Sequence, residues 1–261
     1  MEIEEVQKLI AYFIIYSFLG WILESTYKTI MQKKFVNSGF LYGPICPIYG
    51  IGAIIMLLFL NSFSEHIFIL FLVGMLLLTV WEYLVGLGLE KIFKIKYWDY
   101  SENKYNFQGR VCLSHSMVWG ALGVLFIALI HPQIKNILDN ISNETLLTIC
   151  ILVTVYLLID FIVSIIKIKN ITVKIKILKE LTITIKEKTE ELKNLIENNS
   201  TKKKYRNKLK ETIGELNKKQ QELREKIERQ TSRLRKAFPT MHLKEFGAAI
   251  NKRIKELKGE K

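Results

Sequence analysis

Three glutamates lie inside strongly apolar stretches of this chain, where a charged side chain is expensive. Glu24 stands toward the end of the first stretch, and Glu82 and Glu90 lie in the second half of the third. Residues four apart in a helix drift by only about 40° around its axis, so Glu82, Gly86 and Glu90 share one face. Such a carboxylate can bind a cation, exchange protons or make a structural hydrogen bond. Glu24 and Glu90 each also have a lysine nearby that could neutralise them.

A second group of polar side chains lies in the segment 96–116, KYWDYSENKYNFQGRVCLSHS, which leads into the fourth apolar stretch. Asp99, Asn106 and Arg110 could bind a polar ligand, and the planar guanidinium of Arg110 suits a carboxylate or a phosphate. His115 could titrate near neutral pH, whereas a lone histidine is more often a satisfied core residue. The alternative is an interfacial loop whose aromatic residues lie at the level of the lipid headgroups.

The segment 39–50, GFLYGPICPIYG, is apolar and yet rich in residues that interrupt helices. Prolines fix φ and remove a backbone donor, while glycines open backbone angles that other residues avoid. Broken backbone at membrane depth is tolerated only where protein or water satisfies its polar groups. We therefore predict a re-entrant or helix-entry element, packed between membrane helices. Its assigned residues are Gly43, Pro44, Pro47, Tyr49 and Gly50.

Stretches of roughly 20 apolar residues are long enough to cross a bilayer as helices. Five such spans are predicted, and the second is short unless the Gly–Pro segment completes it. They cover about 9–28, 48–60, 67–93, 113–130 and 146–166. The fold class expected is therefore an all-α polytopic membrane protein. The first span is expected to be retained, because its acidic N-terminal flank is unlike that of a signal peptide.

The distribution of basic residues predicts the orientation of these spans. The connections after the first, third and fifth spans are rich in Lys and Arg, whereas NSFSEH (61–66) and HPQIKNILDNISNE (131–144) hold one lysine between them. The positive-inside rule then places the N-terminus outside and the basic C-terminal region in the cytoplasm.

Residues 171–261 carry the whole net charge of +13, since 1–170 contain twelve basic and twelve acidic residues. Leu and Ile recur there at spacings of four and three between charged residues, as in a coiled coil, with a polar break, ENNST, at 197–201. We predict a cytoplasmic helical hairpin over 171–236 after a membrane domain over 1–170, and a basic amphipathic tail over 237–261. A parallel coiled coil between subunits is the alternative. Apolar and polar residues also alternate over 171–185, which would suit a strand.

Several kinds of chemistry have no support in the sequence. There is no G-x-x-x-x-G-K-[ST] phosphate loop, so the chain does not hydrolyse ATP by that route. No H-E-x-x-H, no G-x-S-x-G and no CxxC pair occurs. We therefore assign no catalytic residue, no metal ligand and no cofactor. Because the basic tail is tethered to a membrane domain, its expected partner is the lipid surface and not a nucleic acid.

Several motifs are distinctive in combination: GWILE (20–24), FVNSGFLYGPICPIYGIGA (35–53), EYLVGLGLE (82–90), YWDYS (97–101) and NFQGRVCLSHSMVWG (106–120). Together with the tail AFPTMHLKEFGAAINKRIKELK (237–258), they resemble the CmpB-like family of ABC-transporter permeases of type IV. The resemblance implies a bacterial membrane protein with a transport role. It also implies an ATPase supplied by another chain.

The leading hypothesis is a permease whose site lies between spans one to four near the inner leaflet. Glu24 and Glu82 would bind a cation or exchange protons, and Arg110 with Asp99 would gate or orient the substrate. A second hypothesis is a membrane scaffold or sensor that acts through its coiled coil. A third is an enzyme acting on a lipid headgroup, which would need an acid and a base within reach of the substrate. The heptads favour a homo-oligomer.

Overall fold

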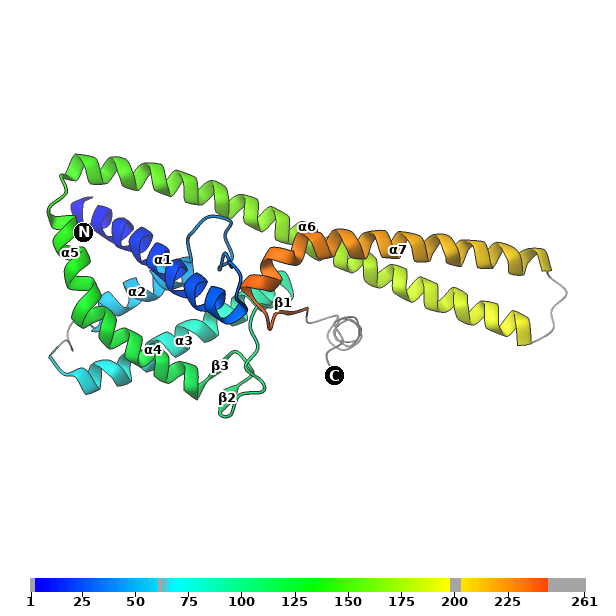
Figure 1. The fold of residues 1–261 in the computed structure, drawn as a ribbon, viewed down its shortest axis with the longest axis horizontal. Helices are drawn as coiled ribbons and strands as arrows, with labels where there is room; N and C mark the ends of the chain where they lie inside the picture. The colour runs from blue at the N-terminus through cyan, green and yellow to red at the C-terminus, as the bar shows by residue number, and fades with distance from the viewer. Residues whose placement is uncertain (1–2, 61–62, 64, 198–202, 244–261) are drawn as a thin grey trace. The chain divides into compact units, whose positions relative to one another are not determined.

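The computed structural model of the protein describes residues 3–60, 63, 65–197 and 203–243, and nearly all of them are helical (Figure 1). The described residues fall into two compact units. The first comprises residues 3–164 together with 234–243, and it contains most of the apolar sequence. The second comprises Ile165–Arg233, which is dominated by charged residues.

Within the described part of the chain, four helices are long and apolar enough to cross a membrane. They are Glu4–Gln32, Ile67–Phe93, Leu113–Asp139 and Asn143–Ile196. A shorter apolar helix, α2 (Pro47–Leu60), has 14 residues and is therefore about 21 Å long, less than the roughly 30 Å of a hydrocarbon core. Four of the predicted spans thus have a matching helix. The count of five, which depends on α2, stays a prediction.

Helices α1 (Ile3–Gln32) and α2 are joined by residues 33–46, which form no regular structure, as the Gly–Pro segment predicts. Helix α2 begins at Pro47, a position where the missing N–H would have no partner within the helix. The two helices pack closely at Gly50. A Cβ atom on Gly50 would lie 2.0 Å from Ser17 Oγ and 2.6 Å from the carbonyl oxygen of Phe13, so only glycine fits.

Helix α3 (Ile67–Phe93) is followed by three short strands. After them comes the helix Leu113–Asp139, which matches the predicted fourth span and is here called the fourth apolar helix. The strands are β1 (Ile95–Lys96), β2 (Asn106–Phe107) and β3 (Val111–Cys112), of which β2 and β3 form a tight hairpin. Residues 61, 62 and 64 of the connection predicted at 61–66 lie outside the described residues.

The fourth apolar helix extends further than predicted. It consists of α4 (Leu113–Leu125), a wide π-helical turn η2 (Phe126–Ile130) and α5 (His131–Asp139), so that much of the expected connection 131–144 is helical. Pro132 lies in the first turn of α5. Its ring would clash with the carbonyl group four residues earlier in a regular α-helix, and the wide turn stands at that point.

Helix α6 (Asn143–Glu197) runs without interruption through the predicted fifth span and into the second unit. The segment 171–185 is therefore helical, and its alternating pattern does not mark a strand. Its buried apolar residues follow the helical spacing of three and four. They are Ile168, Ile171, Ile175 and Leu178, whereas Val173 is 57% exposed.

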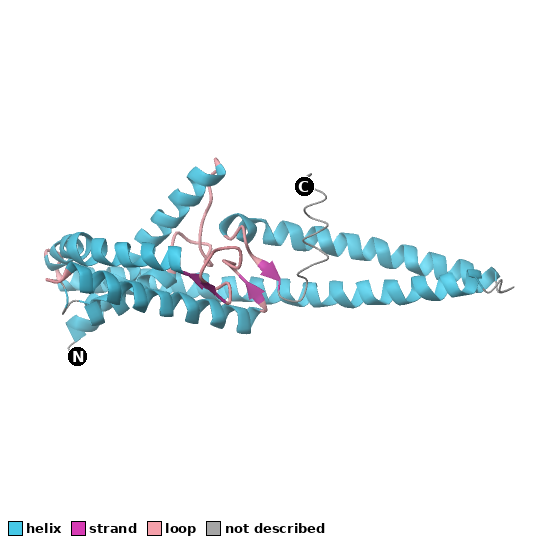
Figure 2. Cartoon of the chain, turned by 90° about the horizontal axis from the view of Figure 1, so that it is seen from below, coloured by secondary structure: helices cyan, strands magenta, loops and turns pink. Residues whose placement is uncertain are grey.

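Within the second unit, α7 (Lys203–Ala237) lies alongside the later part of α6 and runs in the opposite direction (Figures 1 and 2). Three side-chain hydrogen bonds define this antiparallel order. They join Lys174 to Gln230 at 2.9 Å, Thr182 to Gln220 at 2.7 Å and Glu191 to Tyr205 at 2.6 Å. Most of the predicted break ENNST, at 197–201, lies outside the described residues.

The chain after α7 belongs to the first unit again. Strand β4 (His242–Leu243), which lies within the predicted amphipathic tail, pairs antiparallel with β1. Lys28 Nζ donates to the carbonyl of Ala237 and lies 4.9 Å from the centre of the Phe238 ring. The Phe238 ring also contacts Tyr97 edge to face. Residues 234–243, here called the return segment, are thus fixed to the first unit. The remainder of the predicted amphipathic tail lies outside the described residues.

Candidate functional site

Glu82 is buried within α3, with only 5% of its surface exposed. Its two carboxylate oxygens accept hydrogen bonds from Tyr100 Oη at 3.1 Å and from Trp119 Nε1 at 3.0 Å. Tyr100 belongs to the loop after β1, and Trp119 to α4. Among the residues that the structure describes, no basic side chain forms an ion pair with Glu82. The carboxylate is therefore held by neutral donors alone.

Burial raises the pKa of Tyr100, and the neighbouring charge of Glu82 raises it further. The phenol therefore keeps its proton at neutral pH and acts as a hydrogen-bond donor to the carboxylate. A second contact fixes the ring from its other side, since Tyr100 stacks on His115 with the ring centres 4.3 Å apart. This arrangement fixes the Glu82 side chain from outside α3.

Glu82 lies at the wall of a cavity of about 130 Å³ between α1, α2, α3 and the fourth apolar helix. Its lining is almost entirely apolar, and Glu82 is the one charged residue among the described residues that line it. Five aromatic side chains contribute to the wall. They are Tyr16, Tyr49, Trp81, Trp119 and Phe126. We call this space the Glu82 cavity.

Glu24 lies near the same cavity but has a basic partner. Lys28 Nζ, one helical turn later, lies 2.5 Å from its carboxylate, as the spacing of four residues allows. The thiol of Cys46 approaches the other carboxylate oxygen at 3.8 Å. Tyr49 lies within electrostatic reach of both Glu24 and Glu82. The structure thus brings two of the predicted carboxylates into one neighbourhood.

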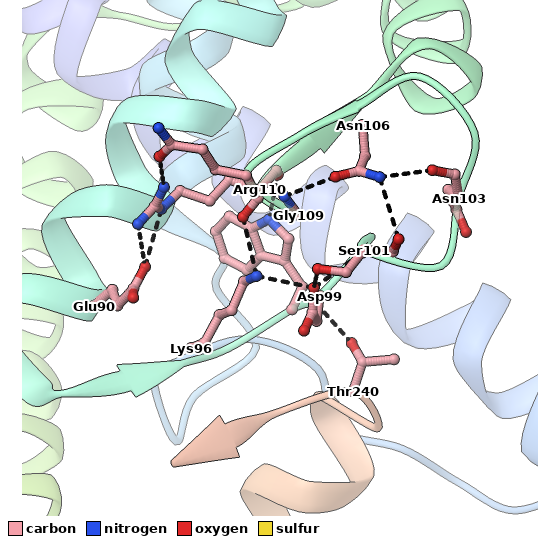
Figure 3. A network of polar contacts seen from close by, with 11 residues as sticks. Glu90, Lys96, Asp99, Ser101, Asn103, Asn106, Gly109, Arg110 and Thr240 are labelled. Carbon is pink, nitrogen blue, oxygen red and sulfur yellow. Dashed lines mark hydrogen bonds and ion pairs between the residues drawn. The ribbon is translucent and has the colours of Figure 1, made fainter. Parts of the chain in front are cut away.

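The other predicted residues form a separate network in the loop between α3 and α4 (Figure 3). Glu90 and Arg110 make an ion pair whose side chains are 6% and 10% exposed. Arg110 donates to the same Glu90 oxygen from Nε at 3.0 Å and from Nη2 at 2.5 Å, and it also contacts Gln108. The Arg110 charge is thus engaged within the protein, so it is poorly placed to receive an anionic ligand.

Asp99 has partners in its own loop. It accepts from Lys96 Nζ at 2.9 Å and from Ser101 Oγ at 2.6 Å, and its backbone N–H donates to Thr240 Oγ1 of the return segment at 3.1 Å (Figure 3). Burial alone would raise the pKa of Asp99, but the hydrogen bonds from Ser101 and Lys96 outweigh it and lower the pKa. Asp99 is therefore an ionised anchor for the loop.

Asn106 shapes the turn that follows. Its side-chain amide donates to the carbonyls of Asn103 and Ser101, and its oxygen accepts from the N–H of Gly109 at 3.0 Å (Figure 3). Gly109 has a positive φ of 65°, and a Cβ atom there would lie 2.4 Å from Asp99 Oδ1. The turn therefore requires glycine, and Asn106 acts within the loop.

His115 lies at the start of α4, where its Nδ1 is 3.1 Å from the thiol of Cys112. Its ring reaches the Glu82 neighbourhood only through its stacking on Tyr100. The seven predicted polar residues thus divide into two groups. Glu24 and Glu82, with His115 beyond Tyr100, lie at the cavity end, and Glu90, Asp99, Asn106 and Arg110 form the loop network.

The Gly–Pro segment is held in place by a carboxylate from another helix. Asp160 of α6 accepts the backbone N–H groups of Tyr42 at 3.1 Å and Gly43 at 2.7 Å. A Cβ atom on Gly43 would also collide with the Tyr156 hydroxyl. These contacts satisfy the exposed donors of irregular backbone, as a membrane setting requires. Of the assigned residues, Tyr49 alone lines the Glu82 cavity, while Gly50 packs α2 on α1.

Sequence reasoning did not select Tyr100, Trp119 or Asp160 as site residues. Asp160 is noticeable in the sequence as a carboxylate in an apolar stretch, a signal that was interpreted as a structural partner and not as a site residue. No comparable signal exists for Tyr100 and Trp119, since aromatic residues are abundant at membrane interfaces. Their role depends on which donors the fold brings to Glu82.

Comparison with known proteins gives one match. Residues 11–165 match the family described as "Putative ABC-transporter type IV". This part of the chain includes the Glu82 cavity and the whole loop network except Thr240. No curated protein and no solved structure matches the chain.

Proposed function

Because the chain belongs to the ABC-transporter type IV family, we propose that it is the permease component of a transport system, with its solute site in the Glu82 cavity. The family and the four long apolar helices make it a membrane-embedded, transporter-related protein. In the proposal, the solute reaches the cavity from the cytoplasm, since the basic connections favour that side for the Glu82 and Glu90 ends of the helices.

This proposal rests on the surroundings of Glu82. A carboxylate buried in a membrane helix is costly, and such residues usually face a partner or a solute pathway. The partners that the structure gives Glu82 are two neutral donors, and its surroundings are an apolar cavity. Tyr100 and Trp119 orient the carboxylate without neutralising it, which leaves its charge for a cation or a proton.

Glu24 has a supporting role in this proposal. Its ion pair with Lys28 keeps a second negative charge near the cavity while limiting repulsion with Glu82. Lys28 in turn holds the return segment through Ala237. A movement of the return segment would therefore alter the pairing of Glu24, and with it the electrostatic potential at the cavity.

The test of the proposal is the variant Glu82→Gln, which preserves the shape of the side chain and removes its charge. Proteoliposomes that contain the purified chain together with any ATPase that copurifies with it, that are supplied with ATP and that enclose a pH-sensitive dye, report proton-coupled flux after a pH step. We expect the flux of the variant to fall at least about tenfold, since a bound charge is worth more than 1.4 kcal/mol in this setting. Glu102→Gln, in the exposed part of the loop, is the matched control.

Two results would contradict the proposal. One is a flux through wild-type vesicles no greater than through empty liposomes, and the other is an unchanged flux in Glu82→Gln. The unfolding midpoint of each variant in detergent shows whether it has folded. A Glu82→Gln chain that unfolds at once would instead assign Glu82 a structural role.

The family also leads us to propose that a separate ATPase drives this permease, since the chain has no phosphate loop. The heptads of α6 and α7 lead us to propose that the second unit is a coiled-coil hairpin and that the protein self-associates. Purification in a gentle detergent, followed by mass spectrometry, tests both points. A stoichiometric ATPase is expected. A chain that elutes alone as a monomer would contradict both the ATPase partner and the self-association.

A further inference from the structure

We propose that the Glu82 cavity takes a small organic ammonium ion, with an alkylated nitrogen and a size no greater than that of a benzene ring. This inference rests on the proposed function for the location of the solute site, and it adds the chemical class of the solute. Three features of the cavity support it: the residues that form its wall, the hydrogen bonds that their polar groups already make, and its volume.

The wall combines one carboxylate with several aromatic rings. Glu82, which is 5% exposed, supplies the negative charge, and Tyr16, Tyr49, Trp81, Trp119 and Phe126 supply aromatic surface. An ammonium group with methyl substituents is attracted to aromatic faces by cation–π interactions, and its alkyl groups fit apolar walls. A carboxylate among aromatic rings is therefore well suited to an alkylated cation.

Three of the lining aromatic side chains have polar groups that are already engaged. Trp81 Nε1 donates to the carbonyl of Ile48 at 2.9 Å, and Trp119 Nε1 donates to Glu82 at 3.0 Å. The Tyr16 hydroxyl is 2.8 Å from His131 Nδ1. These three groups are therefore not available to an anion or a sugar, and Glu82 would repel an anion. The rings are held in place before any ligand arrives, which lowers the entropic cost of binding.

Inorganic cations fit the wall poorly. Ca²⁺ and Mg²⁺ require about six oxygen ligands, and dehydration of Mg²⁺ is slow and costly. The cavity offers the Glu82 carboxylate and little else, and the described residues contain no cluster of three or more metal-ligating side chains. An alkylammonium ion needs no such oxygen shell.

The volume of the cavity suits a small ligand. An engineered cavity of about 150 Å³ in another protein binds benzene, so a space of about 130 Å³ accommodates an ion such as tetramethylammonium. A longer alkyl chain would extend beyond this space.

Binding of radiolabelled tetramethylammonium to the purified full-length chain in detergent, followed by scintillation proximity, tests this inference. We expect saturable binding that excess sodium or tert-butanol, a neutral molecule of similar shape, does not displace. Glu82→Gln should abolish it, and Trp81→Leu should weaken it by about 2- to 30-fold, the range expected from one cation–π contact. Trp21→Leu, outside the cavity lining, should leave it unchanged.

The outcomes separate this inference from the proposed function. Equal competition by tert-butanol, or full binding by Glu82→Gln, would overturn the ammonium assignment. An absence of tetramethylammonium binding together with Glu82-dependent proton flux would also overturn it and leave the permease standing. Specific binding without any flux would support the ligand class and count against transport. Glu82→Asp, which keeps the charge, should retain weakened binding if charge is the determinant.

Discussion

Removing either member of the buried ion pair between Glu90 and Arg110 should destabilise the protein, and the pH dependence of this loss should differ between the two partners. Their side chains are 6% and 10% exposed, and both guanidinium contacts fall on one carboxylate oxygen. Removing one member of a buried pair typically costs about 3–5 kcal/mol, whereas replacing both by apolar residues is often close to neutral. We therefore expect Glu90→Gln and Arg110→Met each to destabilise the protein by several kcal/mol, and the double variant to cost much less than their sum.

The losses of stability in Glu90→Gln and in Arg110→Met should also depend differently on pH. An arginine cannot release its proton, so Glu90→Gln leaves a buried charge at any pH between 5 and 8. In Arg110→Met, the carboxylate can take up a proton. For a group that titrates near pH 4.3 in water, this costs at most about 4 kcal/mol at pH 7 and about 1 kcal/mol at pH 5. The penalty of Arg110→Met should thus shrink by roughly 3 kcal/mol on acidification, and that of Glu90→Gln should not.

Reversible unfolding in mixed micelles of dodecyl maltoside and SDS, followed by circular dichroism, provides the free energies of unfolding at pH 7 and pH 5. The wild type and the three variants complete a double-mutant cycle at each pH. Penalties that add without coupling, or single variants that cost less than about 1 kcal/mol, would refute the assignment of a buried pair.

Two further predictions concern packing and pH. Gly50→Leu should destabilise the protein by about 3 kcal/mol or more, because its side chain would meet backbone and side-chain atoms of α1. Gly88→Leu, where nothing lies within 4 Å, should cost little, and equal unfolding midpoints for the two variants would contradict the close contact. For Asp99, whose pKa is lowered on folding, the stabilisation is present above its ordinary pKa and is lost as the pH falls through the lowered value. The difference in unfolding midpoint between wild type and Asp99→Asn should therefore narrow below about pH 4, and a constant difference down to pH 3 would be the contrary result.

The sequence was sufficient to predict the all-helical membrane fold and the broken Gly–Pro segment. Long apolar stretches can cross a bilayer only as helices, and prolines cannot lie inside a regular helix, so these features follow from local chemistry. The extent of the fourth apolar helix was not predictable in the same way. The wide turn η2 accommodates Pro132, whereas the predicted span ends at about residue 130.

The site was predictable only in part. The cost of a charge in an apolar stretch drew attention to Glu82, and the i, i+4 spacing indicated Lys28 as a partner for Glu24. The partner of Glu90 is Arg110, 20 residues later, and the donors to Glu82 lie 18 and 37 residues away. Such pairings depend on how the loop between β1 and α4 folds back on α3, and no local pattern encodes that path.

The pairing of β1 with β4 has a consequence for the order in which the protein is made. Lys96 and its partner His242 are 146 residues apart, and the whole of α6 and α7 lies between them. At roughly 5–20 residues per second, translation reaches His242 about 7–30 s after Lys96. The apolar helices are therefore synthesised, and free to enter the membrane, well before the return segment exists. A chain released from the ribosome before this point would contain all the apolar helices but would lack the strand that pairs with β1.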